Sequence, residues 1–331
     1  MDWFVSGLRA IKRRIFRTIE SLNPWFWILG VRPSSGSRVE HIWPPSNFSK
    51  RSSVLWRLVD YPLAVAGVFK PHYPRAEGSH FATFHNEHLV IADALQRTTF
   101  DSPSYFFVDI GSGDGVDMSN TFLLAEQGVD GIALEFNPSK FAMMSVSYRA
   151  LPKVQLARVP VTPLNVVSLL EGLGCPEEPT ILNLDIDSYD YDVLAVLLKR
   201  YRFPLLCLEI NPIFPLEIQF KVNFPSAEWS GDLFQGMSLS LASQLLRDNG
   251  YKISHIDRAF LFAVRADHAS GFDVPTSDEE LQRMLDESLK GSNWDYVLAN
   301  FRDRPTEEIF AAFELLFAKK PQDAFSLTFA P

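Results

Sequence analysis

Cysteine is nearly absent from this chain, with only Cys175 and Cys207 among 331 residues. Two cysteines cannot supply the disulfide framework of a small secreted domain, so that class of protein is excluded. Cys207 lies in an apolar run, where a cysteine usually acts as a small buried hydrophobe. The sequence therefore predicts a reducing compartment, the cytoplasm.

Long apolar runs are absent as well, and no stretch approaches the roughly 20 residues that span a bilayer. Arg9, Lys12 and Arg13 interrupt the opening segment, so we expect no signal peptide. We find no internal repeat and no low-complexity segment. Hydrophobic residues at 47% and charged residues at 21% predict a folded globular chain with a substantial core.

The net charge of -9 is unevenly distributed along the chain. Residues 1–60 contain ten Lys and Arg against four Asp and Glu, so the rest of the chain carries a net charge of -15. A basic arm on an acidic body is compatible with an anionic partner surface. The acidic body argues against nucleic acid as the main ligand.

Residues 2–22 have the periodicity of an amphipathic basic helix. Apolar side chains such as Trp3, Leu8 and Ile15 recur at three- and four-residue steps, and cationic side chains take other positions. One interpretation is a helix in a membrane interface, at the inner face, with its cations towards anionic lipid. The other is an apolar stripe that docks on the body or on a second subunit. Residues 1–30 are thus candidates for peripheral membrane contact or for self-association.

Composition and periodicity divide the chain into four parts. A Pro- and Ser-rich linker follows the basic helix, and amphipathic stripes typical of two or three helices occupy residues 277–320. We expect an arm at 1–53, a helical region leading into the core at 54–100, a ligand-binding domain at 101–268, and a C-terminal helical extension at 269–331.

From residue 105 onwards, short apolar runs alternate with helical segments. Strands are predicted at residues 105–111, 131–137, 154–160, 180–187 and 204–211. This alternation is typical of an α/β fold with a doubly wound, mostly parallel sheet. Residues 249–265 contain two further strand-like runs with almost no connection, which should form an antiparallel hairpin.

The first of these strands runs into a glycine-rich turn, YFFVDIGSGDG. Gly111, Gly113 and Gly115 can take backbone angles barred to other residues, and without side chains they let a ligand touch the main chain. We expect a helix at residues 116–127, whose unpaired amides would face that ligand. Taken alone, the turn is also compatible with an ordinary junction between a strand and a loop.

Acidic and amide side chains accumulate where the predicted strands end. In an open parallel sheet, ligands bind beyond the carboxyl ends of the strands, so these side chains are the candidate site. They are Asp109, Glu135, Asn137, Asp185, Asp187, Glu209 and Asn211.

Glu135 lies 20 residues after Gly115, where a carboxylate can accept hydrogen bonds from both ribose hydroxyls of a nucleoside. A nicotinamide dinucleotide is the generic inference. However, Asp109 and Asp114 place two negative charges beside the turn, which disfavours a pyrophosphate. A cofactor with a sulfonium and an amino acid tail suits the turn better, and Asp109 would then order the loop and face the ammonium of the cofactor.

These motifs resemble the class I S-adenosylmethionine-dependent methyltransferases. VDIGSGDG is similar to their first motif and ALEFNP to their second, and the resemblance covers about residues 105–265. It implies a Rossmann-like, mostly parallel seven-stranded sheet whose last strand is antiparallel. It also implies S-adenosylmethionine as the cofactor. The cofactor-binding residues would be Asp109, Gly111, Ser112, Gly113, Gly115, Glu135, Asn137 and Asp185.

More narrowly, LNLDIDSYDYDVL followed by LEINP resembles FkbM-type and related O-methyltransferases. This implies methylation of a hydroxyl on a sugar, glycolipid or natural-product acceptor, a small molecule or glycan. The upstream stretch FHNEHLVI looks like a degraded form of the Gly-Glu-Asp helix start of that family. Glu87 matches the acid there, but Asn86 replaces the glycine and His88 the aspartate.

Asp185 and Asp187 stand two residues apart on a strand and should project the same way, as should Glu209 and Asn211 on the next strand. Such a cluster repels itself, and a divalent cation such as Mg²⁺ would relieve the repulsion. The metal ligands would be Asp187, Glu209 and Asn211, with Asp187 and Glu209 as the catalytic residues. Alternatively, Asp187 acts as a general base without a metal, or the acids only cap helices and hold water.

Several other residues border the expected acceptor pocket. Residues 211–232 form a long aromatic segment, suited either to a lid that excludes water or to a surface loop with its own aromatic cluster. The remaining candidates are Tyr189, Asp190, Tyr191, Asp232 and His255.

Two rival functions stay open on the sequence. A nicotinamide-dependent oxidoreductase would need a Tyr/Lys or His acid-base pair near the strand ends, and none is convincing. A non-catalytic binding protein on the same fold is disfavoured by the intact acids at the strand ends.

Overall fold

The computed structural model describes residues 87–98, 105–116, 118–225, 233–292, 295, 298 and 304–331. The predicted basic arm at residues 1–53 lies outside the described residues, as do Asn86 and Asp232. Within the described ranges, no helix is both long enough and apolar enough to cross a membrane.

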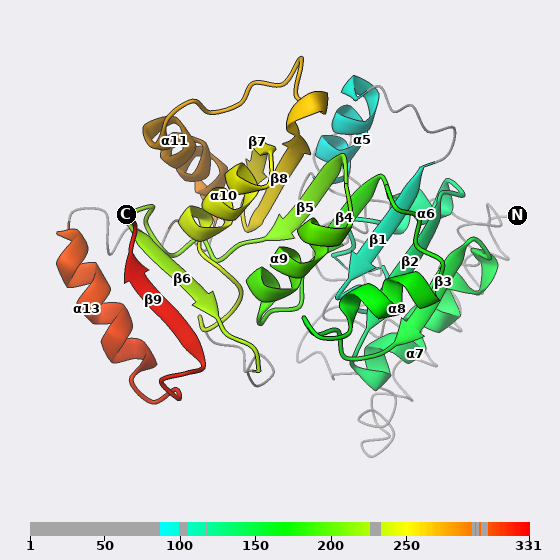
Figure 1. Ribbon diagram of the computed structural model, residues 1–331, viewed down its shortest axis with the longest axis horizontal. Helices are drawn as coiled ribbons and strands as arrows, with labels where there is room; N and C mark the ends of the chain where they lie inside the picture. The colour runs from blue at the N-terminus through cyan, green and yellow to red at the C-terminus, as the bar shows by residue number, and fades with distance from the viewer. Residues whose placement is uncertain are drawn as a thin grey trace, which may run out of the picture.

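A seven-stranded sheet forms the centre of the fold, in the order β3-β2-β1-β4-β5-β8-β7 (Figure 1). The strands are β1 (Phe106–Ile110), β2 (Asp130–Glu135), β3 (Val154–Arg158), β4 (Ile181–Leu184), β5 (Leu205–Glu209), β7 (Tyr251–Asp257) and β8 (Phe260–Arg265). The first five are parallel, whereas β8 runs antiparallel to both β5 and β7. The predicted doubly wound sheet and its closing hairpin are confirmed.

Helices cover both faces of the sheet because side chains on both faces of its strands are apolar. Val108 of β1 packs with the helices of one face, which are α8 (Val166–Gly172), α9 (Asp190–Arg200), α10 (Leu239–Asp248) and α11 (Asp278–Leu289). Its neighbour Phe107 packs with those of the other, which are α5 (Glu87–Arg97), α6 (Phe122–Glu126) and α7 (Pro138–Ser147). Neither Val108 nor Phe107 is exposed to solvent.

The helix expected at residues 116–127 begins only at Phe122 and has five residues. Two local features delay it. Met118 takes a left-handed backbone conformation, with φ of 58°, which interrupts a helical path. The Ser119 hydroxyl then accepts hydrogen bonds from the amides of Thr121 and Phe122, at 3.3 and 3.0 Å. The glycine turn therefore leads into an irregular loop, and the prediction of a helix directly behind it was wrong.

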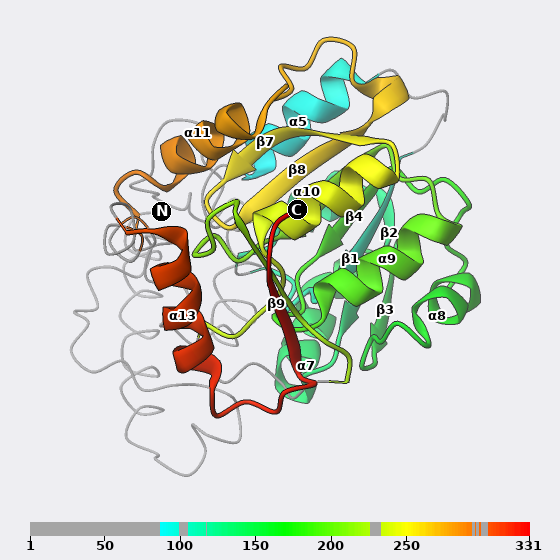
Figure 2. The ribbon, with the colours of Figure 1, turned by 60° about the vertical axis from the view of Figure 1, so that its left-hand side comes forward.

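The segment at residues 211–225 belongs to a second, smaller sheet. Its strand β6 (Ile218–Val222) pairs antiparallel with β9 (Phe325–Phe329), which lies beside α13 (Thr306–Phe317) in Figure 2. The rings of this layer form one buried cluster, made by Phe214, Phe220, Phe234, Phe313 and Phe317. Of the two interpretations of this segment, its described part, residues 211–225, therefore matches the second, a segment with its own aromatic cluster.

The C-terminal helices are confirmed as α11 and α13, but β9 was not predicted. Its sequence, FSLTF, is short, and only its pairing with β6 makes it a strand. We call residues 218–225, which run from β6 towards the first turn of α9, the strap.

Candidate functional site

Three carboxylates meet at the carboxyl ends of β4 and β5. Leu184 and Leu208 are paired neighbours near the ends of the two strands, and acids follow at Asp185, Asp187 and Glu209. One ligand atom from each acid lies within 4.8 Å of the other two. The sequence predicted this convergence from strand ends alone, and the structure brings these three acids together.

Burial raises the pKa of all three groups, and repulsion by neighbouring acids adds to the rise at Asp185 and Glu209. Burial raises the pKa of Asp185 to about 8, with further contributions from Asp187 and Asp190. Burial and then Asp185 raise the pKa of Glu209 well above its ordinary value. The pKa of Asp187 is raised by burial too, and the nearby Lys140 ammonium opposes this. The cluster therefore favours the protonated form of its carboxyl groups.

Glu209 has one carboxylate oxygen in use and one to spare. Its Oε1 accepts a hydrogen bond from Gln235 Nε2 at 3.3 Å. Its Oε2 is buried and has no hydrogen-bond partner among the residues that the structure describes. A buried carboxylate oxygen without a partner is unfavourable, because it has given up its hydration without replacement.

The turn that carries Asp187 is held in an uncommon backbone conformation. Asp187 has a φ of 56°, in the left-handed region that few non-glycine residues occupy. Asp190 holds the turn, because its fully buried carboxylate accepts hydrogen bonds from the amides of Ile186 and Ser188, both at 2.9 Å. Asp190 thus holds the turn that carries Asp187, and whether it also faces an acceptor stays untested.

The glycine turn packs directly against this acidic turn. A Cβ at Gly111 would lie 1.6 Å from the carbonyl oxygen of Asp185, and one at Gly115 would lie 2.7 Å from the Tyr148 ring. Gly113 differs, because it has a φ of 59° and, apart from its chain neighbours, no atom of the described residues stands within 4 Å of its missing Cβ. Two of the glycines are thus explained by packing within the protein, and the third faces open space.

Asp109 lies behind the turn in a buried polar network. Its Oδ2 accepts a hydrogen bond from Thr121 Oγ1 at 2.6 Å, and its Oδ1 accepts one from Asn183 Nδ2 at 2.8 Å. The Ser112 hydroxyl donates to the Asp109 carbonyl at 3.1 Å. The structure thus agrees with the expectation that Asp109 orders the loop. That it also faces an ammonium stays a prediction.

Glu135 ends β2 beside the glycine turn. Its Oε1 accepts a hydrogen bond from the Asn137 amide at 2.5 Å. Burial raises the pKa of this carboxyl, and the amides of Asn137 and Gly113 and the charge of Lys140 work against that rise. The Asn137 side chain itself caps α7 by accepting from the amides of Ser139 and Lys140. Asn137 therefore positions Glu135 through its backbone, and its side chain serves the helix.

The side-chain amide of Asn211 donates its hydrogen bonds to backbone carbonyls and not to the three carboxylates. Its Nδ2 donates to the carbonyls of Leu233 and Gln235, at 2.9 and 3.1 Å, and the residue is 1% exposed. Both amide protons are thus engaged with the backbone. That Asn211 serves as a metal ligand through its Oδ1 stays a prediction.

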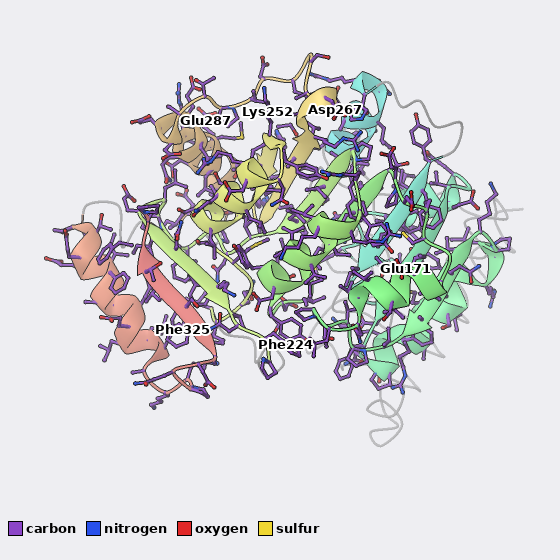
Figure 3. The ribbon with its side chains drawn as sticks, in the orientation of Figure 1. Glu171, Phe224, Lys252, Asp267, Glu287 and Phe325 are labelled. Atoms are coloured by element: carbon purple, nitrogen blue, oxygen red, sulfur yellow. The ribbon has the colours of Figure 1, made fainter. Side chains whose placement is uncertain are left out.

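An aromatic pair borders the acidic turn on the side of the strap. Phe224, labelled in Figure 3, packs edge to face on Tyr189 with ring centroids 5.1 Å apart. The Tyr189 hydroxyl donates to the Val161 carbonyl at 3.1 Å. Asp192 accepts from the Phe224 amide at 2.9 Å and forms an ion pair with Lys221. Tyr189 follows Asp187 by two residues, and that it borders an acceptor stays a prediction.

The remaining candidates lie outside this constellation. His255 is on β7, half-buried against the Phe262 ring, and burial lowers its pKa. Glu87 begins α5 as a fully buried residue, and His88 is buried beside it.

Sequence reasoning missed the residues that support the site. Asn183 lies on β4 two residues before Asp185 and pairs in register with Asp109, so the period of a strand could have revealed it. Lys140 and Gln235 carry no comparable signal, because they lie on elements distant in sequence from the acids they serve.

A search by sequence gives no match to a protein-family model or to a curated protein. Similar solved structures include an S-adenosylmethionine-dependent methyltransferase from Clostridium acetobutylicum, with 11% identity over 54% of this chain and 90% of that one, and a TM-score of 0.35. Magnesium protoporphyrin IX methyltransferase from Synechocystis with bound S-adenosylmethionine has 13% identity over 54% and 78%, with a TM-score of 0.35. The methyltransferase domain of METTL16 has 14% identity over 66% and 82%, with a TM-score of 0.41. These likenesses concern the fold alone.

The raised pKa values predict a stability that falls as pH rises. Asp185 and Asp190 have folded pKa values of about 8 and about 6, against an ordinary value of 3.8, so the folded chain holds more protons than the unfolded one in this window. The free energy of unfolding must therefore decrease with rising pH between about 4 and 8. We expect the Tm of the protein in EDTA to fall over that range. Asp185→Asn should flatten the fall, and an unchanged profile in this variant would contradict the assignment.

Proposed function

We propose that this protein is an S-adenosylmethionine-dependent methyltransferase that acts on a hydroxyl of a small-molecule or glycan acceptor. The observation that supports it best is the contact between the glycine turn at Gly111 and the acidic turn at Asp185. This contact sets a loop suited to a cofactor beside a cluster suited to deprotonating an acceptor. The sequence resemblance suggests the same pairing of functions.

The residues around the glycine turn fit this cofactor. Gly113 faces open space, so a ligand can approach the main chain there. Glu135 is held by the backbone with acceptor capacity left for ribose hydroxyls, since a carboxylate offers about four lone-pair sites. The neighbouring acids suit a cation better than a pyrophosphate. When bound, S-adenosylmethionine supplies an electrophilic methyl group on its sulfonium.

The three carboxylates would prepare the acceptor. Asp187, whose turn has a left-handed backbone and whose carboxylate lies close to those of Asp185 and Glu209, would take the hydroxyl proton. A divalent cation is compatible with the same three acids, because their oxygens are the ligands that Mg²⁺ prefers. Such an ion would lower the pKa of the acceptor hydroxyl. In both cases the protein mainly positions and deprotonates the acceptor.

A thermal-shift comparison tests the proposal. We expect S-adenosylhomocysteine to raise the Tm and NAD⁺ to leave it unchanged, because a ligand that binds only the folded state stabilises it by mass action. A Tm that responds to NAD⁺ and not to S-adenosylhomocysteine would overturn the proposal in favour of an oxidoreductase. Repeating the series with Mg²⁺ tests the metal: a further rise supports it, and an unchanged Tm favours Asp187 as a base without metal.

A further inference from the structure

Helix α13 is apolar on both of its faces. Ile309, Phe313 and Phe317 recur at four-residue steps and are buried in the aromatic cluster against β6 and β9. Yet Leu315 is 79% exposed and Leu316 is 54% exposed on other sides of the same helix. Large apolar side chains exposed together on one helix are typical of an interface, so the outer side of α13 has that character.

The outer side of α13 has an ordered pattern of charge. Glu308, Ala312, Leu315 and Lys319 follow one another at steps of four, three and four residues, so they lie along one side of the helix and the turn after it. We call these four residues the outer stripe. It begins with an acid, is apolar in its middle and ends with a base. Figure 1 places α13 on the far side of β9 from the central sheet, with nothing of the described fold beyond it.

We propose that the outer stripe is a self-association surface, on which α13 pairs antiparallel with α13 of a second copy. In that arrangement, Glu308 of one copy lies opposite Lys319 of the other, twice by symmetry, and Leu315 packs near the axis. A two-fold interface needs a surface complementary to itself, which an acid and a base at opposite ends of an apolar stripe provide. Antiparallel helix dipoles also attract each other.

The charge pattern favours a second copy of α13 over an anionic lipid surface and over the basic arm of the same chain. An anionic lipid surface would be repelled by Glu307, Glu308 and Glu314, which are all exposed on this helix. The basic arm at residues 1–53 would meet the acids favourably but would set its cations against Lys319. Only a partner with both charges in reversed order satisfies the whole outer stripe.

The expected dimer is weak. A helix of 12 residues is about 18 Å long, so two such helices bury less area than the roughly 1,200–2,000 Å² of a stable interface. Glu314 lies off the stripe without a base opposite it, which weakens the pair further. We expect dissociation in the micromolar range of concentration.

Sedimentation velocity on the full chain, over a series from low to high micromolar concentration, tests the proposal. We expect a concentration-dependent dimer in the wild type and a monomer throughout for Leu315→Glu. Glu308→Lys and Lys319→Glu should each weaken association several-fold, and the double variant should restore it. All three positions are exposed, so an unchanged Tm confirms that these variants fold.

Several outcomes would overturn the self-pairing. A wild type that stays monomeric at the highest concentration contradicts it, and so does a dimer that persists in Leu315→Glu, because association then uses another surface. If the double variant does not regain association, the antiparallel arrangement is contradicted. A monomeric wild type whose Tm drops in Leu315→Glu would show that another part of the chain covers the stripe.

Discussion

Replacing Gly113 with alanine is expected to leave the fold in place and to weaken binding of S-adenosylhomocysteine by at least tenfold, about 1.4 kcal/mol. Gly113 has open space where the Cβ would stand, so the added methyl group meets no protein atom. It occupies instead the space through which the proposed cofactor approaches the main chain. Isothermal titration calorimetry with S-adenosylhomocysteine measures the affinity, and thermal unfolding measures the stability.

The chain provides matched controls for this variant. Gly174 also has a positive φ, 78°, and an equally empty surrounding. Gly174→Ala should share the backbone strain of about 1–2 kcal/mol without any loss of binding. Gly111→Ala should fail differently, because its Cβ would overlap the Asp185 carbonyl and destabilise the protein itself. Equal affinities for Gly113→Ala and the wild type would refute the proposed approach at this turn.

Asp187→Asn is expected to raise the Tm in metal-free buffer while reducing methyl transfer by about 10²–10⁴-fold. The substitution removes one negative charge from a cluster whose members raise one another's pKa, so the folded state loses repulsion. Asparagine tolerates the left-handed backbone of this position well, which limits any strain. The substitution also removes the carboxylate that would act as the base or as a metal ligand.

Two measurements follow the variant separately. Transfer of labelled methyl groups to a panel of hydroxyl acceptors, sugars and glycolipids among them, reports activity. Thermal unfolding with and without Mg²⁺ reports metal binding, and any Mg²⁺-dependent rise of the wild type should vanish. Asp190→Asn is the contrast, because Asp190 receives two backbone amides and its loss should lower the Tm. A drop in Tm for Asp187→Asn would show that Asp187 supports the structure instead.

Local patterns were sufficient to predict the sheet and the meeting of its acids. Parallel strands bring their carboxyl ends to one edge, so Asp185, Asp187 and Glu209 had to converge once the strands were recognised. The role of each individual side chain was harder to predict from the sequence. Asn211 follows the strand period that predicted a ligand, yet two backbone carbonyls, at Leu233 and Gln235, engage its amide. Those carbonyls belong to a segment more than 20 residues away, so the sequence around Asn211 does not indicate them.

The errors in the secondary structure have physical causes of the same kind. Residues 116–121 have helical spacing, but a left-handed Met118 and the Ser119 hydroxyl stop the helix until Phe122. Strand β9 follows from tertiary pairing, since five residues alone have little tendency to form a strand. Aromatic residues in 211–232 suggested a lid as well as a cluster, and for residues 211–225 the positions of Phe313 and Phe317 show the cluster.

The pairing of β6 with β9 also sets an order in time for a newly made chain. Asn223 at the strap donates to the carbonyl of Asp323, 100 residues later. At translation rates of about 5–20 residues per second, β6 waits roughly 5–20 s for its partner to be made. During that interval the rings of Phe214 and Phe220 lack their C-terminal cover on the nascent chain. The strap therefore gains its strand partner only after β9 has been made, and until then β6 has an unpaired edge.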